Sequence, residues 1–333
     1  MPLVRTLFQK PTLCASADGE YEEKAAEWFE LLLDLVLVAA CAAIADALKE
    51  DLTADGFYTF TSSFGLVITG WHAYTRFTTR FNDSSLVHSA LLFVFIFAFA
   101  GMSVSAGSAT SQGIFVRAAS LMRLSVVLMN LVVYLRLPAA RSGLFVELTI
   151  GAAGITILLC SLVVPQFDAR PFYVATLFFE GFVQAEWTIR RAGLLANTTK
   201  FVIRMNIDHA NEREGCFVMI VLGESVLSAV LKMGDKAVEK GWDYWVAMAL
   251  TLLTIFCTAL YYFDMRPPRA WHAMRRSRRG GTLFYWIHYL LQLSLLAMGV
   301  GLKFCFRALL GEAAAEGETG CRLRSPWPKL DDS

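Results

Sequence analysis

Long apolar runs, each with few or no charged residues, recur along the chain and limit its possible folds more than any other feature. A helix needs about 20 residues to cross the hydrocarbon core of a membrane, because each residue adds about 1.5 Å. Backbone groups in lipid must find their hydrogen bonds within the protein, so only helices and closed barrels span membranes. The runs are too long and too continuous for barrel strands. The sequence therefore predicts an all-α fold, a polytopic transmembrane helical bundle.

Length and hydropathy predict about nine spans. They cover residues 28–48, 56–76, 86–107, 114–135, 144–164, 171–189, 216–231, 242–263 and 283–306. The seventh is short, but no proline interrupts residues 205–231, so its helix is expected to begin near Met205. The chain is thus divided into a cytoplasmic N-terminal segment (1–27), a transmembrane helical domain (28–306) and a polar, disordered tail (307–333).

The composition agrees with a membrane protein, since 56% of the residues are hydrophobic and only 18% are charged. Soluble enzymes, secreted modules and disordered regulators are disfavoured. A net charge of +1 gives no support for binding nucleic acid. Seven scattered cysteines without a C-x-x-C pair indicate neither a disulfide framework nor a zinc site. The expected partner is the lipid bilayer, and no cofactor is expected.

Lysine and arginine are unevenly distributed between alternate connections. One set of connections, which includes the N-terminus and residues 190–215 and 264–282, holds 18 of these residues, whereas the opposite set holds 9. Cytoplasmic loops carry the excess of basic residues in membrane proteins. We therefore expect the N-terminus in the cytoplasm and the C-terminus outside, most simply in the plasma membrane.

Four ionisable residues lie deepest within the expected spans: Asp34, Arg123, Glu180 and Glu224. Each costs about 2.5 to 3.5 kcal/mol at the middle of a membrane, so together they would cost roughly 10 to 14 kcal/mol if they faced lipid. They must therefore face one another or water. Arg123 is the one basic side chain near the middle of a span, and it is the expected partner for one of the acids.

Other polar residues gather at the cytoplasmic ends of the spans. Glu30 and Asp34 are four residues apart on one helical face, and His288 lies at a similar depth. We predict a vestibule open to the cytoplasm and closed outward by small residues at 103–107 and 151–154, which allow close helix contact.

His209, Glu212 and Arg213 have helical spacing at the start of the seventh span. A histidine and an acid at this spacing could relay a proton or bind a metal, although the second histidine of the zinc motif H-E-x-x-H is absent. Three interpretations stay open: structural ion pairing, a proton or cation pathway, and catalysis. A metal is neither predicted nor excluded.

Six short motifs occur in one order along the chain. They are Glu30-Leu-Leu-Leu-Asp34-Leu-Val, Trp71 with Arg80-Phe-Asn82-Asp83, His209-Ala-Asn-Glu212-Arg213, Val221-Leu-Gly-Glu224-Ser225, Tyr262-Phe-Asp264 and Trp286-Ile-His288. This series resembles the low temperature requirement A (LtrA) membrane protein family over roughly residues 27 to 305. The chain differs from the family pattern at Leu32-Leu33, where an aromatic pair is usual, and at Glu214-Gly215. The resemblance implies a multi-pass membrane protein linked by name to growth in the cold, without a known substrate.

Two functions are carried forward. In the first, the protein is a proton- or cation-coupled transporter or channel, in which Glu30, Asp34 and Glu224 form a carboxylate site that Arg123 partly neutralises. The candidate pathway residues are Glu30, Asp34, Arg123, Glu180, His209, Glu212, Arg213, Glu224 and His288. In the alternative, the protein is a structural or lipid-interacting membrane protein of cold or stress tolerance. An enzyme is not expected.

Overall fold

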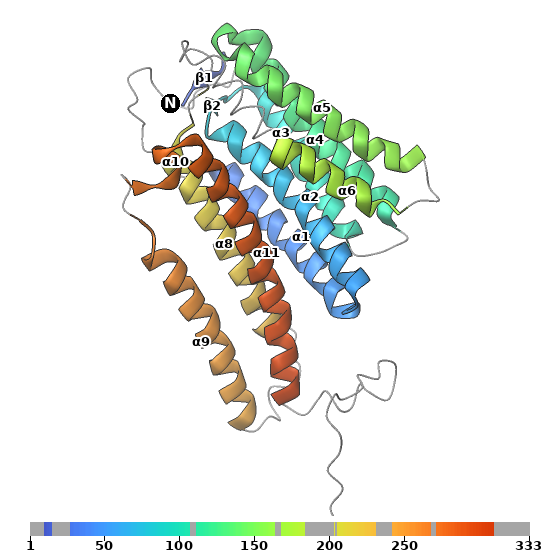
Figure 1. Cartoon of the computed structure of the whole chain (residues 1–333), viewed down its shortest axis with the longest axis vertical. Coiled ribbons are helices and arrows are strands. Elements are labelled where there is room, and N and C mark those ends of the chain that lie inside the picture. The colour runs from blue at the N-terminus through green and yellow to red at the C-terminus, as the bar shows by residue number, and fades with distance from the viewer. Residues whose placement is uncertain are drawn as a thin grey trace, which may run out of the picture.

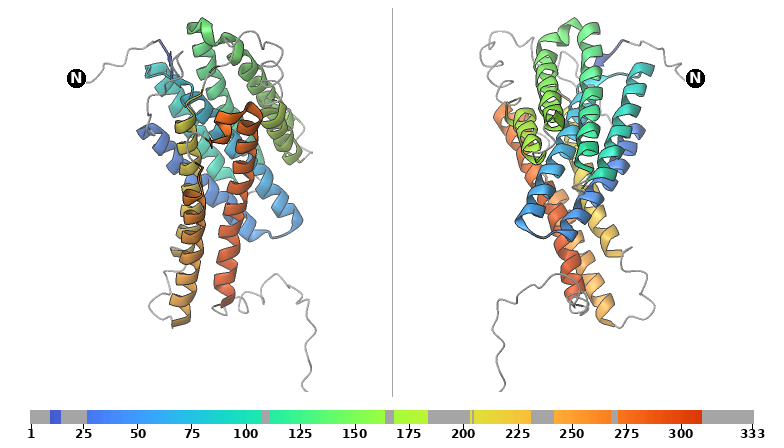
Figure 2. Two further views of the ribbon diagram at one scale, coloured as in Figure 1. Left: turned by 60° about the vertical axis from the view of Figure 1, so that its left-hand side comes forward. Right: turned by 90° about the vertical axis from the view of Figure 1, so that its right-hand side faces the viewer.

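Long helices run side by side along one axis in the computed structural model (Figures 1 and 2). The structure describes residues 10–14, 27–106, 111–163, 168–183, 203, 205–230, 242–267 and 271–309. The helices are α1 (Trp28–Glu50), α2 (Ala54–Thr78), α3 (Leu86–Ser105), α4 (Gln112–Arg136), η2 (Pro138–Ala140), α5 (Arg141–Val163), α6 (Arg170–Leu177), the π-helical η3 (Phe178–Val183), α8 (Ile207–Val230), α9 (Trp242–Asp264), α10 (Ala273–Arg276) and α11 (Arg278–Leu309).

Two short strands mark one end of the bundle. In β1 (Thr12–Leu13) and β2 (Phe81–Asn82), Thr12 pairs antiparallel with Asn82, and Leu13 with Phe81. We call this the sheet end. The helices α1, α8 and α11 begin at the sheet end, and α2, α4 and α9 finish there (Figure 1). The predicted N-terminal segment and tail lie largely outside the described residues, as do residues 184–189 of the sixth span.

The all-α membrane bundle is confirmed, but the count of nine spans is not. Among the described residues, six helices are long and apolar enough to cross a membrane: α1, α3, α4, α5 (with η2), α9 and α11. The helix α6 with η3 is described over only 14 residues. The helices α2 and α8 have the length but are not apolar enough, because they carry many polar and charged side chains.

Packing explains why α2 and α8 can be polar. The helix α2 contacts α1, α4, α6, α8 and α11, and 16 of its 25 residues are buried. The helix α8 lies between α1, α2, α9 and α11. Their polar side chains therefore face other helices, where hydrogen bonds are available, rather than lipid. The helix α8 begins at Ile207, as expected from the uninterrupted sequence after Met205.

Side-chain caps determine where several helices begin. The hydroxyl groups of Thr53 and Ser85 accept hydrogen bonds from backbone N–H groups in the first turns of α2 and α3. Glu27 and Glu30 form a capping box at the start of α1, and Asn206 Oδ1 accepts from the His209 N–H at the start of α8. Such caps satisfy N–H groups that have no partner within the helix.

The apolar core surrounds α2. Phe217 of α8 lies edge-on to both Phe64 and Trp71 of α2, with ring centroids 6.2 and 4.9 Å apart. Small residues allow close approach elsewhere, as predicted for 151–154. A Cβ atom at Gly154 would lie 2.7 Å from Glu180 Oε1, and one at Gly151 would lie 2.6 Å from a methyl group of Val127. The glycine at 154 therefore provides the space in which Glu180 lies.

Candidate functional site

Ionisable side chains from four helices meet inside the bundle near the sheet end. We call this set the polar core; it consists of Glu30 and Asp34 of α1, Trp71 and His72 of α2, His209, Arg213 and Glu214 of α8, and Gln292 of α11. Each of these side chains is buried. Charges that leave water need partners and hydrogen bonds, so the geometry of the pairs decides what the polar core can do.

Arg213 and Asp34 form a two-pronged ion pair between α8 and α1. Arg213 Nη1 donates to Asp34 Oδ2 at 2.6 Å, and Nη2 donates to Oδ1 at 2.8 Å. Trp71 Nε1 also donates to Oδ1, at 3.1 Å, and the guanidinium carbon lies 5.2 Å from the indole ring. The planar fork of arginine matches a carboxylate in this way. Three helices are thereby joined at Asp34.

Glu30 and His209 make the second contact between α1 and α8. His209 Nε2 lies 3.2 Å from Glu30 Oε1, and Glu30 Oε2 accepts from the Glu27 N–H at 3.0 Å. His209 also belongs to the first turn of α8, where Asn206 fixes its backbone. The imidazole is thus held against a carboxylate by the starts of two helices.

His72, Glu214 and Gln292 connect α2, α8 and α11. His72 Nε2 lies 2.9 Å from Glu214 Oε1, and Gln292 Nε2 donates to Glu214 Oε2 at 2.9 Å. The carboxylate of Glu214 is fully buried. A histidine beside a buried carboxylate can hold a proton between the two groups.

His288 of α11 lies near this triplet. Its Nε2 is 3.0 Å from the Tyr262 hydroxyl oxygen of α9, and its Nδ1 is 2.9 Å from the Phe284 carbonyl oxygen. His288 also interacts electrostatically with Glu214. The candidate His288 therefore lies in the neighbourhood of the polar core.

Arg123 and Glu180 form a separate pair deeper in the bundle. Arg123 Nε and Nη2 donate to Glu180 Oε1 and Oε2 at 2.6 and 2.9 Å. Nη2 also donates to Thr69 Oγ1 at 2.9 Å and to the Leu66 carbonyl oxygen at 3.3 Å, both on α2. Arg123 therefore pairs with one of the deep acids, as expected, but the prediction that it partly neutralises the Glu30, Asp34 and Glu224 site is wrong, because its guanidinium is engaged by Glu180.

The predicted carboxylate cluster is also corrected. Glu224 is buried on α8 but follows Arg213 by 11 residues, about 16 Å along the helix. It interacts electrostatically with Cys41, about two turns beyond Asp34 on α1. Glu224 therefore does not share a site with Glu30 and Asp34. The rise of α8 separates Glu224 from Arg213, the residue of the same helix that contacts Asp34.

The expected trio at the start of α8 divides into two faces. Glu212 is 46% exposed, and its Oε2 lies 3.9 Å from His209 Nδ1. Arg213 points the other way, to Asp34. The helical spacing therefore brings His209 near Glu212 but not near Arg213, since successive helical residues differ by about 100° in direction.

Basic side chains surround the sheet end outside the polar core. Arg80, which follows α2, pairs with Glu147 of α5, and Arg275 of α10 pairs with Asp208 of α8, with 2.9 Å between Nη2 and Oδ2. His272 caps α10 by accepting from the Met274 N–H. Burial, and then the positive charge of nearby groups, lowers the pKa of His272 below its usual value of 6.5, which keeps its ring nitrogen available as an acceptor.

Sequence reasoning missed several members of the polar core. Glu214 was noted only as a difference from the family pattern, and Trp71, His72, Tyr262 and Gln292 were not among the candidates. A helical projection of α8 separates Glu214 from Glu212, but only knowledge that α2 lies opposite would identify His72 as its partner. In the part of the chain that is described, no group of three or more His, Cys, Asp or Glu residues could hold a metal ion.

Comparison with known proteins agrees with the motif series. The family model described as Bacterial low temperature requirement A protein (LtrA) matches residues 25–321. No curated protein and no solved structure matches the chain. The match covers most of the sequence and includes every helix of the polar core. The chain therefore belongs to the LtrA family of membrane proteins.

Proposed function

We propose that this LtrA-family protein is a proton-coupled membrane transporter or channel in which the polar core takes up and releases protons. One observation carries the proposal. Four of the five histidines in the chain are buried, and three of these lie within hydrogen-bond distance of another titratable group: His72 of Glu214, His209 of Glu30, and His288 of Tyr262. Histidine is the side chain that ordinarily changes charge between about pH 5 and 8.

A proton fits this arrangement better than a metal cation does. The carboxylates of Glu30, Asp34 and Glu214 each already meet a basic side chain. A metal cation would have to displace a histidine or an arginine, whereas a proton can move between imidazole and carboxylate without displacing either group. The coupled ion is therefore proposed to be a proton.

Adjacent residues link the two ion pairs of the polar core. Trp71 and His72 are neighbours on α2, and Arg213 and Glu214 are neighbours on α8. The helix α8 thus presents Arg213 to Asp34 and Glu214 to His72. A change in the charge of the His72–Glu214 pair would act on the Asp34–Arg213 pair through the protein interior, where electrostatic interactions are stronger than in water. This is a physical route from proton uptake to movement of α8 against α1.

The sheet end is proposed to face the cytoplasm at the plasma membrane, in accordance with the excess of basic residues there. Ser277, between α10 and α11, is exposed at this end, and Leu52, between α1 and α2, is exposed at the other. In a cysteine-free background, Ser277→Cys should react with an impermeant maleimide only after cells are permeabilised, and Leu52→Cys should react in intact cells. The reverse pattern would contradict the orientation.

Proton flux tests the function directly. Purified protein in lipid vesicles with an imposed pH gradient is expected to collapse the gradient, as reported by a pH-sensitive dye inside the vesicles. Glu214→Gln should abolish this flux, because the amide cannot accept the proton held with His72. The matched control is Glu50→Gln, which removes an exposed carboxylate at the far end of α1 and should leave flux unchanged. A native protein without flux under either gradient direction would contradict the proposal.

A structural or lipid-interacting role is the second candidate. The pairs Asp34–Arg213 and Arg123–Glu180 each use two hydrogen bonds and leave little free charge, as expected of residues that join helices. This role predicts that neutral replacement of both members of a pair is tolerated, whereas a proton pathway predicts loss of activity.

A further inference from the structure

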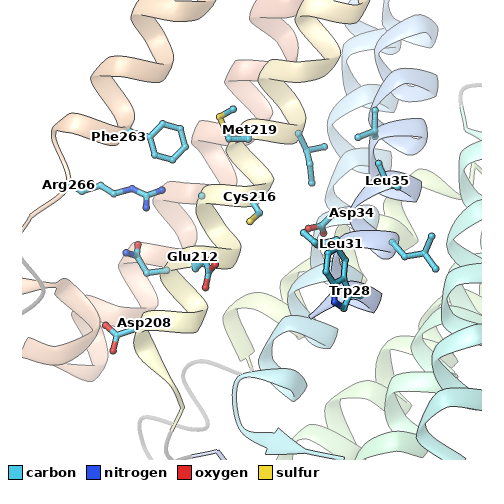
Figure 3. Close-up of a pocket in the computed structure, with 15 residues that line it drawn as sticks. Trp28, Leu31, Asp34, Leu35, Asp208, Glu212, Cys216, Met219, Phe263 and Arg266 are labelled. Atoms are coloured by element: carbon cyan, nitrogen blue, oxygen red, sulfur yellow. The ribbon is translucent and has the colours of Figure 1, made fainter. Parts of the chain in front are cut away.

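A pocket of about 810 Å³ lies between α1, α8 and α9 and borders the polar core at Asp34. Exposed apolar side chains of α1, including Leu31, Leu32 and Leu35, form one wall, and Phe263 of α9 lines the opposite side. The floor is a narrow strip of α8 that runs from Asp208 to Met219 (Figure 3). Because α1 and α9 are both membrane-spanning candidates, this groove opens sideways toward the bilayer.

Polar groups lie at one end of the groove. Arg266 follows the last turn of α9, and Asp208, Asn211 and Glu212 lie in the first turns of α8. Figure 3 shows the guanidinium of Arg266 pointing from α9 toward α8, with Glu212 and Asp208 at the same end of the pocket. Trp28, which is 86% exposed at the first residue of α1, also lines this end. Tryptophan is enriched where a membrane meets water. The groove therefore extends from headgroup depth into the apolar layer.

Among the described residues Arg266 has no carboxylate partner, unlike Arg123, Arg213 and Arg275. Its Nε and Nη2 atoms are buried without a hydrogen-bond partner, and the guanidinium carbon lies 4.9 and 4.5 Å from the ring centroids of Tyr262 and Phe263. A Cβ atom at residue 215 would clash with Nη2, so Gly215 allows the guanidinium to lie directly on α8. Arginine presents five donors to phosphate or carboxylate groups, and an anion at this site would engage them.

The neighbouring carboxylates differ in how far they are already neutralised. Asp208 is paired with Arg275, and Asp34 with Arg213. Glu212 is half exposed, and its one ion-pair contact among the described residues is the distant one to His209. Among the described residues, the polar end thus offers one guanidinium without a carboxylate partner and one carboxylate open to a cation. An apolar helix of a second copy would leave both charges without partners, whereas a lipid with a phosphate and an amine would match them.

We propose that this groove is a binding site for a phospholipid with a primary amine, of the phosphatidylethanolamine type. The phosphate binds the guanidinium of Arg266, the ammonium group lies against Glu212, and an acyl chain lies along Leu31, Leu35 and Met219. The two residues that would bind the headgroup, Arg266 and Glu212, are not members of the polar core, so lipid retention can be measured without proton flux.

Native mass spectrometry tests the site without any activity measurement. The protein is reconstituted in vesicles of equal parts phosphatidylethanolamine and phosphatidylglycerol with the same acyl chains, extracted in mild detergent, and examined for retained lipid. One phosphatidylethanolamine per chain is expected. Arg266→Gln should lower retention of both lipids at least tenfold, which corresponds to about 1.4 kcal/mol. Arg276→Gln removes an exposed arginine of α10 that does not line the groove, and it should have no effect.

Two further variants separate the headgroup from the acyl chain. Glu212→Gln should shift the retained lipid toward phosphatidylglycerol, because the carboxylate that favours the ammonium group is gone. Leu35→Trp, at a side chain that is 68% exposed on the groove wall, should displace the lipid without disturbing the core, which keeps the test valid if Arg266→Gln fails to fold. Equal retention of both lipids by the native chain, equal retention by Arg266→Gln and Arg276→Gln, or a lipid-free dimer would each overturn the proposal.

Discussion

Replacing Arg213 with methionine is expected to remove most of the folded protein from the membrane. The change leaves the Asp34 carboxylate buried with Trp71 Nε1 as its remaining side-chain donor among the described residues. Breaking a buried ion pair from one side costs about 3 to 5 kcal/mol, which is a large share of the roughly 5 to 15 kcal/mol that stabilises a domain. The yield of monodisperse protein in detergent, and its melting temperature, measure the loss.

The paired variant is the control for this prediction. Asp34→Leu combined with Arg213→Met removes both charges together, and it should recover most of the yield because apolar side chains of similar volume replace a buried pair at little cost. Glu212→Ala, one residue before Arg213, should change stability by no more than about 0.5 kcal/mol, since its side chain is 46% exposed. Normal yield from Arg213→Met alone would show that the Asp34–Arg213 pair does not stabilise the bundle.

Arg123→Met should destabilise the protein by a similar amount, because it removes a different set of buried contacts. The guanidinium of Arg123 joins Glu180 to the Thr69 hydroxyl and the Leu66 carbonyl oxygen, so its loss leaves a carboxylate between α4, α5 and α6 without its base. We expect a loss of about 3 to 5 kcal/mol, measured as in the first experiment. The matched variant Arg123→Lys keeps the charge but cannot make both contacts to Glu180 and α2, and it should be intermediate.

Removal of both charges distinguishes pairing from a general need for polar residues at this depth. Arg123→Met with Glu180→Leu should be more stable than Arg123→Met alone. If the double variant is the less stable of the two, the contribution of Arg123 comes from the backbone and hydroxyl groups of α2 rather than from Glu180.

Helix positions could be predicted well from the sequence because lipid imposes both length and hydropathy on a span. The helix α1 was expected at residues 28–48 and occupies Trp28–Glu50, and α9 was expected at 242–263 and occupies Trp242–Asp264. The number of spans could be predicted less well. Hydropathy assumes that a helix faces lipid, whereas α2 and α8 face other helices and carry polar residues that the same measure counts against them.

The charged residues were predicted as a set, but their partners were not. The cost of placing Asp34, Arg123 and Glu180 in lipid follows from the sequence alone, and all three are paired in the structure. Which acid meets which base depends on how helices pack: the members of the Arg123–Glu180 pair are 57 residues apart, and those of the Asp34–Arg213 pair are 179 apart. Glu180 further lies in the π-helical segment η3, a departure from α-helical geometry that hydropathy does not report.

The central claim is tested most directly by measuring proton flux in a variant in which both His72 and Glu214 are replaced by neutral residues. His72→Gln with Glu214→Gln keeps hydrogen-bonding groups at both positions and removes both titratable groups, so the protein should fold with a melting temperature near that of the native chain. The account predicts that this folded variant, in vesicles with an imposed pH gradient, has lost the flux of the native protein. Native flux in the folded double variant would contradict a proton pathway through the polar core.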